Sequence, residues 1–209
     1  MDGRKYAPAT QRNREPILQV LLEVLPPTGT ILEIASGTGE HAVYLAPRLQ
    51  PRKWIPSDAD SSARESISAW INHHNSDNLY QPLDIDASQP IWKVEEEILS
   101  SISDIIAIAN INMIHISPWS ACLGLMAAAG RILPPTGILY LYGPYKQGGK
   151  HTALSNADFD EYLQEQNPEW GVRNLEDVVE AASNHHLTLQ KTYQMPANNL
   201  SVVFQKVKG

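Results

Sequence analysis

The stretch Ile31-Leu-Glu-Ile-Ala-Ser-Gly-Thr-Gly-Glu-His41 decides the fold of this 209-residue chain. Its apolar beginning predicts a buried strand, and the glycines at 37 and 39 predict a tight turn into a helix that starts at Glu40. Such a corner leaves unpaired backbone N–H groups at the start of the helix, and glycines let a ligand come close to the backbone. The stretch therefore predicts a nucleotide-binding site.

Two kinds of nucleotide cofactor fit this corner. The pattern Gly37-x-Gly39-x-x-Ala42 satisfies the dinucleotide fingerprint, and Asp58 follows at about the 20-residue spacing expected of a ribose-binding acid. Glu33, however, is a carboxylate inside an apolar strand, where an unpaired charge is costly to bury. A dinucleotide-binding strand has no general need of that acid, so Glu33 favours a different cofactor.

The pattern Glu33-x-Ala35-x-Gly37-x-Gly39 resembles the first motif of class I S-adenosylmethionine-dependent methyltransferases, with Ala35 in place of the first of three glycines. The resemblance implies that Glu33 orients the loop and the methionine end of the cofactor. It also implies that Ala35, Ser36, Gly37 and Gly39 form the loop that contacts S-adenosylmethionine, whose product after transfer is S-adenosylhomocysteine.

Composition narrows the class of protein. With 43% hydrophobic residues, the chain can bury one core, so residues 1–209 are expected to form a single domain. A net charge of −7 argues against a nucleic-acid partner. The lone Cys122 lies in an apolar helical stretch and is expected to be a packed thiol. No signal peptide or membrane-spanning run is recognised, which predicts a cytoplasmic protein.

Strand and helix patterns alternate along the chain. Strands are expected at 31–35, 53–57, 79–83, 104–109 and 138–142, and helices at 12–25, 40–49, 61–75, 94–101, 118–132 and 175–185. The alternation predicts an α/β fold, a doubly wound Rossmann-like sheet that is mostly parallel and has helices on both faces.

The C-terminal part departs from this alternation. Segments 187–195 and 200–207 are separated by Pro196-Ala-Asn-Asn199 alone, which is too short for a parallel crossover, so they are expected to form an antiparallel hairpin. A parallel sheet that ends in this way resembles the seven-stranded methyltransferase sheet, whose last strand lies beside the fifth. Residues 143–174, irregular apart from a helical piece near 158–166, are the expected cap over the substrate site.

The ends of the second and third strands supply acidic residues. Asp58 is expected to accept hydrogen bonds from both ribose hydroxyls, with Asp60 as the alternative. The methyltransferase resemblance implies that Asp84 binds the adenine amino group and that Ile85 packs on the base, with Asp86 as the alternative acid.

The end of the fourth strand is where a methyl group would face its acceptor. Asn112 and Met113 are expected to contact the cofactor through their backbone. Methyl transfer needs an aligned acceptor and sometimes a base, for which His115 is the candidate, although a structural histidine fits this position equally well. Tyr142, at the end of the fifth strand, is the second catalytic candidate, and its alternative role is to cover the sheet. The loop lacks the Asn/Asp-Pro-Pro-Tyr/Phe signature of enzymes that methylate adenine N6 or glutamine.

Motifs along the whole chain resemble one family of unknown function, the group that includes methyltransferase-like protein 26. They are Gln11-Arg-Asn-Arg-Glu-Pro-Ile17, the corner at 33–41, Pro56-Ser-Asp58, Asn112-Met-Ile-His-Ile-Ser-Pro118, Tyr142-Gly-Pro-Tyr145, Ser155-Asn156, Asn167-Pro-Glu-Trp-Gly171 and Met195-Pro-Ala-Asn-Asn199. The resemblance is specific for the family and unspecific for the reaction.

Polar residues in these motifs are candidates for the acceptor pocket, namely Asn13, Arg14, Tyr145, Asn156 and Asn199. The histidine pairs at 73–74 and 185–186 occupy adjacent helical positions that face different ways, so no metal is predicted.

The leading hypothesis is transfer of a methyl group from S-adenosylmethionine to a small molecule or a protein side chain. The alternatives are an NAD(P)-dependent oxidoreductase and a cofactor-binding regulator without turnover. The sequence does not specify the oligomeric state.

Overall fold

A seven-stranded sheet organises the computed structural model, which describes residues 2–74, 76–92, 95 and 105–208. Its strands are β1 (Thr30–Ile34), β2 (Lys53–Asp58), β3 (Leu83–Asp84), β4 (Ile105–Ile111), β5 (Ile138–Pro144), β8 (Leu187–Met195) and β9 (Asn199–Lys206). They lie in the order β3-β2-β1-β4-β5-β9-β8, and β9 pairs antiparallel with both β5 and β8. The expected α/β class, the mostly parallel sheet and the C-terminal antiparallel pair are confirmed.

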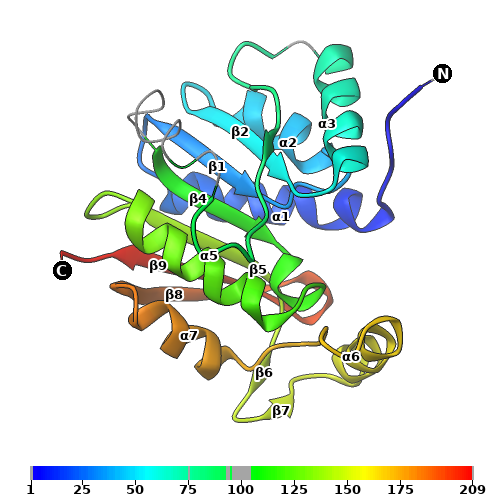
Figure 1. The fold of residues 1–209 in the computed structure, drawn as a ribbon, viewed down its shortest axis with the longest axis vertical. Helices are drawn as coiled ribbons and strands as arrows, with labels where there is room; N and C mark the ends of the chain where they lie inside the picture. Colours follow the sequence, from blue (N-terminus) through cyan, green and yellow to red (C-terminus); the bar gives the residue numbers. More distant parts are fainter. Residues whose placement is uncertain (1, 75, 93–94, 96–104, 209) are drawn as a thin grey trace.

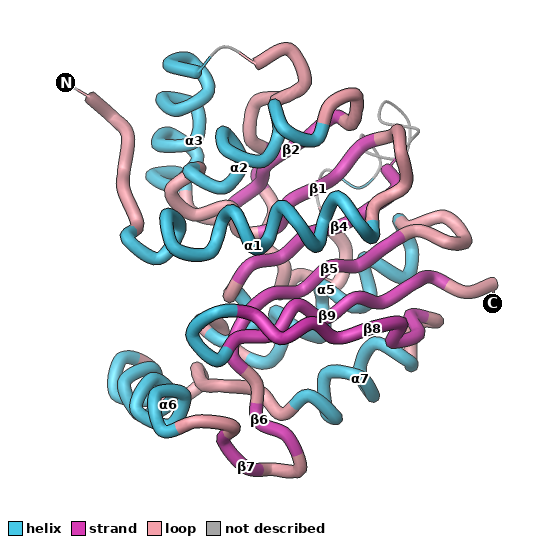
Figure 2. Tube along the Cα trace, turned by 180° about the vertical axis from the view of Figure 1, so that it is seen from behind, coloured by secondary structure: helices cyan, strands magenta, loops and turns pink. Residues whose placement is uncertain are grey.

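Helices cover both faces of the sheet (Figures 1 and 2). One face carries α1 (Pro8–Val24), α2 (Glu40–Leu45) and α3 (Ser61–His74), and the other carries α5 (Trp119–Ile132) and α7 (Leu175–Ser183). The alternation of side chains along a strand explains the two layers: Ile31 joins the buried cluster of α1 to α3, whereas Leu32 joins that of α5 and α7. Both side chains are fully buried, as expected for a central parallel strand.

Prolines account for two differences from the expected elements. The strand expected at 79–83 is wrong in extent, because only Leu83 and Asp84 pair with β2 and Leu79 makes a single bridge to Trp54. Pro82 has no N–H to donate to the ladder. The helix expected at 40–49 ends at Leu45 and continues as a 3₁₀ turn, Ala46–Leu49, because Pro47 removes a helical donor.

Other boundaries shift by a few residues. The first helix begins at Pro8, four residues before the expected start, since proline is well accommodated in a first helical turn. The helix expected at 94–101, apart from Glu95, and the first residue of the strand expected at 104–109 lie outside the described residues.

The expected cap, 143–174, has more regular structure than the sequence suggested. After the end of β5 it forms a small hairpin of β6 (Lys146–Gln147) and β7 (Lys150–His151), followed by α6 (Leu154–Gln166). Asp160 fixes α6 to this hairpin, because its carboxylate pairs with the Lys146 ammonium at 2.7 Å. It also accepts the N–H of Val172, in the segment after α6, at 2.7 Å. Figure 1 shows α6 and the hairpin projecting beyond α7 and the end of β5.

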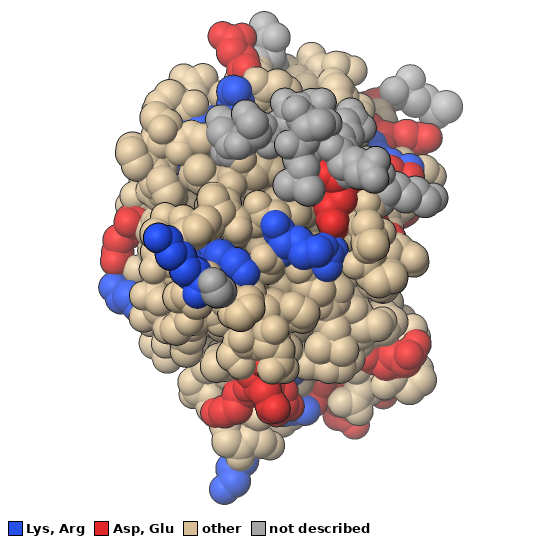
Figure 3. Space-filling model, turned by 60° about the vertical axis from the view of Figure 1, so that its left-hand side comes forward, with Lys and Arg blue, Asp and Glu red and all other residues tan. Residues whose placement is uncertain are grey.

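No helix in the described ranges combines the length and the apolar character needed to cross a bilayer. On the face shown in Figure 3, basic and acidic side chains form separate small groups, and neither sign forms a continuous field.

Candidate functional site

The loop after β1 is built on left-handed backbone. Ala35, Gly37 and Gly39 have φ values of 56°, 57° and 88°. The two glycines have different structural roles. A Cβ at Gly39 would lie 2.9 Å from the Ile67 backbone, whereas a Cβ at Gly37 would meet nothing within 4 Å. Gly39 therefore packs the loop against α3, and Gly37 faces open space that a ligand can enter.

Glu33 lies beneath this loop and is only 1% exposed. Its Oε2 accepts a hydrogen bond from Trp54 Nε1–H at 3.0 Å, and the Ser36 side chain also hydrogen-bonds the carboxyl group. Burial raises the pKa of Glu33 to about 7, in spite of these two bonds. The acid in the strand is thus satisfied within the protein, and its charge changes near neutral pH.

Asp58 stands beside the loop at the end of β2. Its Oδ2 accepts the Gly37 N–H at 2.9 Å, and its Oδ1 accepts the Asp60 N–H at 3.0 Å. Because a carboxylate has about four acceptor positions, further donors can still bind Asp58. Asp60 is engaged elsewhere, since it accepts both the N–H and the hydroxyl of Ser62 at the start of α3.

The loop after β3 presents fewer free groups for binding an adenine ring than the sequence predicted. Asp84 lies opposite Asp58 in the sheet, but its exposed carboxylate pairs with Arg64 at 3.1 Å. Ile85 is 2% exposed and belongs to the hydrophobic core, so its side chain does not present the surface expected for packing on a base. Asp86 is exposed and caps a turn by accepting the Ser88 N–H at 2.9 Å.

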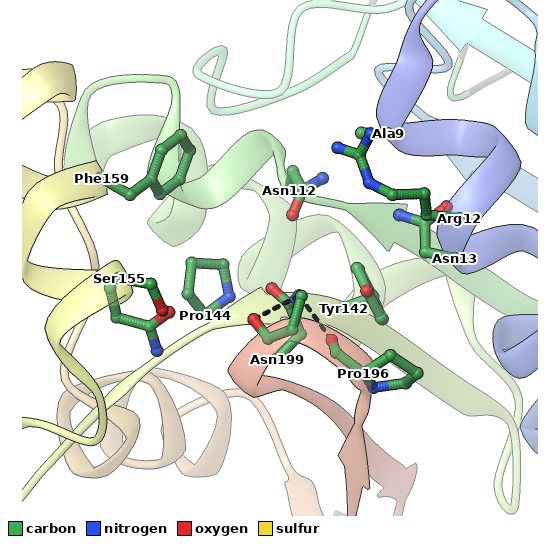
Figure 4. Close-up of a pocket in the computed structure, with 12 residues that line it drawn as sticks. Ala9, Arg12, Asn13, Asn112, Tyr142, Pro144, Ser155, Phe159, Pro196 and Asn199 are labelled. Atoms are coloured by element: carbon green, nitrogen blue, oxygen red, sulfur yellow. Dashed lines mark hydrogen bonds between the residues drawn. The ribbon is translucent and has the colours of Figure 1, made fainter.

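A pocket of about 390 Å³ opens at the carboxyl ends of β4 and β5. Figure 4 shows Arg12 and Asn13 entering from α1, with Ser155 and Phe159 opposite them on α6. Twelve residues line it: Ala9, Arg12, Asn13, Asn112, Tyr142, Pro144, Ser155, Asn156, Phe159, Pro196, Ala197 and Asn199. The structure thus brings together five of the residues that the sequence singled out, namely Asn13, Asn112, Tyr142, Asn156 and Asn199.

Asn112 lines the pocket at the end of β4. It adopts a left-handed φ of 67° directly after β4, and its N–H donates to the Tyr142 carbonyl at 2.8 Å. Its side-chain amide makes no hydrogen bond to any residue that the structure describes. Met113, by contrast, is only 7% exposed and joins the core, so only its backbone is available to a ligand.

A chain of hydrogen bonds orients Tyr142. His41 Nε2 lies 2.8 Å from Asn13 Oδ1, and the Asn13 side chain in turn hydrogen-bonds the Tyr142 hydroxyl. Burial lowers the pKa of His41 to about 4, so its ring is neutral near pH 7. Burial raises the pKa of Tyr142, against the opposing effects of Asn13 and Arg12. The tyrosine is therefore a protonated phenol held in a fixed orientation.

Asn156 and Asn199 fix the outer wall of the pocket. The Asn156 amide donates to the Asn198 carbonyl at 3.0 Å, which ties α6 to the β8–β9 connection. The Asn199 amide donates to the carbonyls of Pro196 and Ala197 at 3.0 and 3.2 Å, the dashed lines of Figure 4. Their amide hydrogens are therefore donated to other groups of the pocket wall.

Three of the expected residues lie elsewhere. His115 is fully buried, its Nδ1 accepts the Arg173 N–H at 3.2 Å, and burial lowers its pKa to about 3. Tyr145 is also fully buried and packs edge-on against the His115 ring. Arg14 stacks over Tyr44 with its guanidinium 4.3 Å from the ring centre. None of the three lines the pocket, and the geometry of His115 suits an interior support and not a base.

Arg12, from the motif at 11–17, also lines the pocket. Ala9, Arg12 and Asn13 are spaced three and four positions apart and so share a helix face, whereas Arg14 lies on another. That spacing was the available signal. Phe159 had no comparable signal, because its place in the pocket depends on how α6 is docked. Among the described residues, no group of three or more His, Cys, Asp or Glu side chains could hold a metal ion.

Comparisons with known proteins identify a family and similar folds. The model of a family described as a protein of unknown function, DUF938, matches residues 4–206. An O-methyltransferase family protein from Burkholderia thailandensis superposes with a TM-score of 0.75 at 12% identity, covering 93% of this chain and 56% of that one. Human N-acetylserotonin methyltransferase in complex with SAM gives 0.73 at 13% identity, covering 96% and 53%.

A third solved structure, an O-methyltransferase family 2 protein from Planctomyces limnophilus in complex with apigenin, gives a TM-score of 0.70 at 16% identity. It is matched over 93% of this chain and 62% of its own length. The chain thus spans little more than half the length of these proteins. At such identities the likeness establishes a shared methyltransferase-type Rossmann-like fold.

Proposed function

The chain belongs to the DUF938 family, and we propose that it is an S-adenosylmethionine-dependent methyltransferase that acts on a small molecule. The observation that carries the proposal is the group of Gly37, Asp58 and Glu33 at the end of β1 and β2, beside a pocket that Asn112 and Tyr142 line. A position within the group that includes methyltransferase-like protein 26 is part of the same proposal.

The residues at the corner fit this cofactor. Gly37 faces open space beside the Asp58 carboxylate, which retains acceptor positions for two ribose hydroxyls. Glu33, buried under the loop, places negative charge near the cationic methionine end whenever it is ionised. Ser36 and the backbone of Asn112 and Met113 complete the binding site in this proposal. For the adenine amino group we retain Asp84, with Asp86 as the alternative acid, and assign Ile85 to the support of that loop.

Bound S-adenosylmethionine would supply an electrophilic methyl group, which passes to the acceptor while the electron pair of the broken bond stays on sulfur. The protein has to hold the acceptor in line with that methyl group. Tyr142 suits this task, since the bonds from His41 through Asn13 fix its hydroxyl in the pocket. His115 is assigned to the support of the loop after β4.

Calorimetric titration tests the cofactor directly. S-adenosylmethionine and S-adenosylhomocysteine should both bind, and Asp58→Asn should weaken both by at least about tenfold, since it removes a charged acceptor. Asp60→Asn is the matched control, because that carboxylate caps α3 and should leave the affinity within about twofold. Absence of binding by the unchanged protein would contradict the proposal.

The two alternatives make different predictions. An oxidoreductase would bind NAD(P)H with a change in coenzyme fluorescence. A regulator would bind S-adenosylmethionine tightly and transfer no labelled methyl group to any component of a cell lysate.

A further inference from the structure

The pocket between α1 and α6 carries a positive charge, although the protein as a whole is acidic. Arg12 is the only charged side chain among its twelve described lining residues. Its guanidinium makes no ion pair or hydrogen bond with any residue that the structure describes. The protein as a whole carries a net charge of −7, whereas the wall of this pocket contains a cation and no acidic side chain among its described residues. An anionic ligand group would pair with Arg12.

Arg12 and two other side chains that line the pocket carry donor hydrogens for which the described residues offer no acceptor. Besides Arg12, the side-chain amide of Asn112 has no partner among the described residues, and the Tyr142 hydroxyl, which hydrogen-bonds Asn13, is a protonated phenol with a hydrogen of its own. The amide hydrogens of Asn156 and Asn199 are already used within the wall. The Arg12 guanidinium supplies the positive charge, and the donor hydrogens of Asn112 and Tyr142 add hydrogen bonds, so these three groups suit an oxygen anion.

The pocket also lacks a base. None of the described lining residues is Asp, Glu, His, Lys or Cys. Tyr142 stays protonated, and His41 directs its Nε2 at Asn13. Glu40 lines the neighbouring hollow, where its carboxylate accepts the Ala7 N–H and the Thr38 hydroxyl. An acceptor that must lose a proton during transfer finds no group here to take it.

We propose that the methyl acceptor is the carboxylate of a small organic acid, bound by Arg12, and that the product is its methyl ester. This inference rests on the proposed methyl transfer and names its substrate class. Ala9, Pro144, Phe159, Pro196 and Ala197 give the walls an apolar part for the body of the acid. A volume of about 390 Å³ limits that body to a small molecule.

The step balances without a base. A carboxylate oxygen forms a bond to the methyl carbon, the bond from that carbon to the sulfonium sulfur breaks, and its electron pair remains on sulfur. The anion and the cation become a neutral ester and a neutral thioether, and no proton moves. A carboxylate is already ionised at neutral pH, because its pKa lies near 4. Arg12, Asn112 and Tyr142 hold one end of the acceptor so that an oxygen lone pair is aligned.

The chemistry of the product gives the test. The protein is incubated with methyl-labelled S-adenosylmethionine and an acid-soluble extract of small metabolites, and the products are then treated with mild alkali. Methyl esters release labelled methanol, whereas N-methyl and ether products keep their label. We expect volatile label that requires the protein, and a loss of roughly tenfold to hundredfold with Arg12→Gln at limiting acceptor. Arg14→Gln, which changes an arginine stacked on Tyr44, is the matched control.

Each outcome decides between the two proposals. Alkali-stable label would overturn the carboxylate inference and leave methyl transfer standing. Absence of any label, with S-adenosylmethionine still binding in calorimetry, would overturn both turnover and the inference.

A binding measurement tests Arg12 independently of turnover. Benzoate and benzamide have nearly the same shape and differ in charge, so we expect the S-adenosylhomocysteine-loaded protein to bind benzoate about tenfold more tightly or better. Arg12→Gln should abolish that difference. Equal affinity, or no binding of benzoate, would overturn the anion site. If Arg12→Gln weakens S-adenosylhomocysteine but not 5′-methylthioadenosine, which lacks the amino-acid carboxylate, Arg12 serves the cofactor and the inference is wrong.

Discussion

Glu33 is the residue at which the fold and the proposed cofactor site meet. Burial at 1% exposure raises its pKa to about 7, while Trp54 Nε1–H and Ser36 hydrogen-bond the carboxyl group. A carboxyl group has a pKa near 4.3 in an unfolded chain. Because the folded value is the higher one, the contribution of Glu33 to stability is fully present below about pH 4.3 and is lost as the pH rises through about 7.

The variant Glu33→Gln tests this linkage. Glutamine still accepts the Trp54 hydrogen bond but does not titrate, so the free energy of unfolding should fall between about pH 4.3 and 7 in the unchanged protein and not in the variant. The difference is on the order of 3 kcal/mol at most, from the size of the pKa change. Urea unfolding at about pH 5 and pH 8 measures it. Glu65→Gln, on the exposed side of α3, is the control; equal slopes in all three proteins would refute the role of Glu33.

His41 is a positioning residue in our proposal, because it acts on Tyr142 through Asn13. Removing its ring nitrogen in His41→Phe should free the Asn13 amide to rotate, and methyl transfer should then fall by about tenfold, the cost of one lost orienting bond. Affinity for S-adenosylhomocysteine should stay within about twofold. His41→Gln keeps an N–H donor and should recover part of the rate, which a purely structural role of the ring would not explain.

At the scale of elements, the sequence predicted most of the sheet. Long apolar runs identified β1, β2, β4 and β5 to within one or two residues, because central strands bury both faces. The start of α6 was missed for a definite reason. Its buried residues Asn156, Asp160 and Leu163 have helical spacing, but two of the three are polar and depend on partners distant in sequence. A hydrophobic pattern cannot reveal a helix that polar contacts hold.

Asp160 is therefore the residue on which the placement of α6 depends. Asp160→Asn should weaken its contacts to Lys146 and His151 and loosen α6, so that the acceptor is bound several-fold more weakly while affinity for S-adenosylhomocysteine is unchanged. The expected loss in the free energy of unfolding is about 1–3 kcal/mol. Asp158→Asn, an exposed change on the same helix, is the control. If both variants behave alike in denaturant unfolding and acceptor titration, Asp160 does not anchor the helix.

At the scale of the whole molecule, the pocket joins segments from both ends of the chain. Ala9 and Arg12 come from α1, and Pro196 and Ala197 from the turn between β8 and β9. The sequence could name polar members of such a pocket, since the ends of parallel strands meet at one edge. It could not decide between a base and a supporting role for His115, because the surroundings of that ring come from residues distant in sequence, such as Tyr145 and Arg173.

This arrangement of the pocket predicts that the cofactor and the acceptor slow amide hydrogen exchange in different segments of the chain. S-adenosylhomocysteine should slow amide hydrogen exchange in the loops after β1, β2, β3 and β4, near 35–39, 58–60, 84–86 and 112–115, because the proposed cofactor contacts lie there. Benzoate added to that complex should slow exchange in the first turns of α1 and α6, near 8–14 and 154–160, which face each other across the pocket. Arg12→Gln should remove only the second effect. If S-adenosylhomocysteine alone protected α1 and α6 fully, the pocket would belong to the cofactor, and the acceptor would have to bind elsewhere.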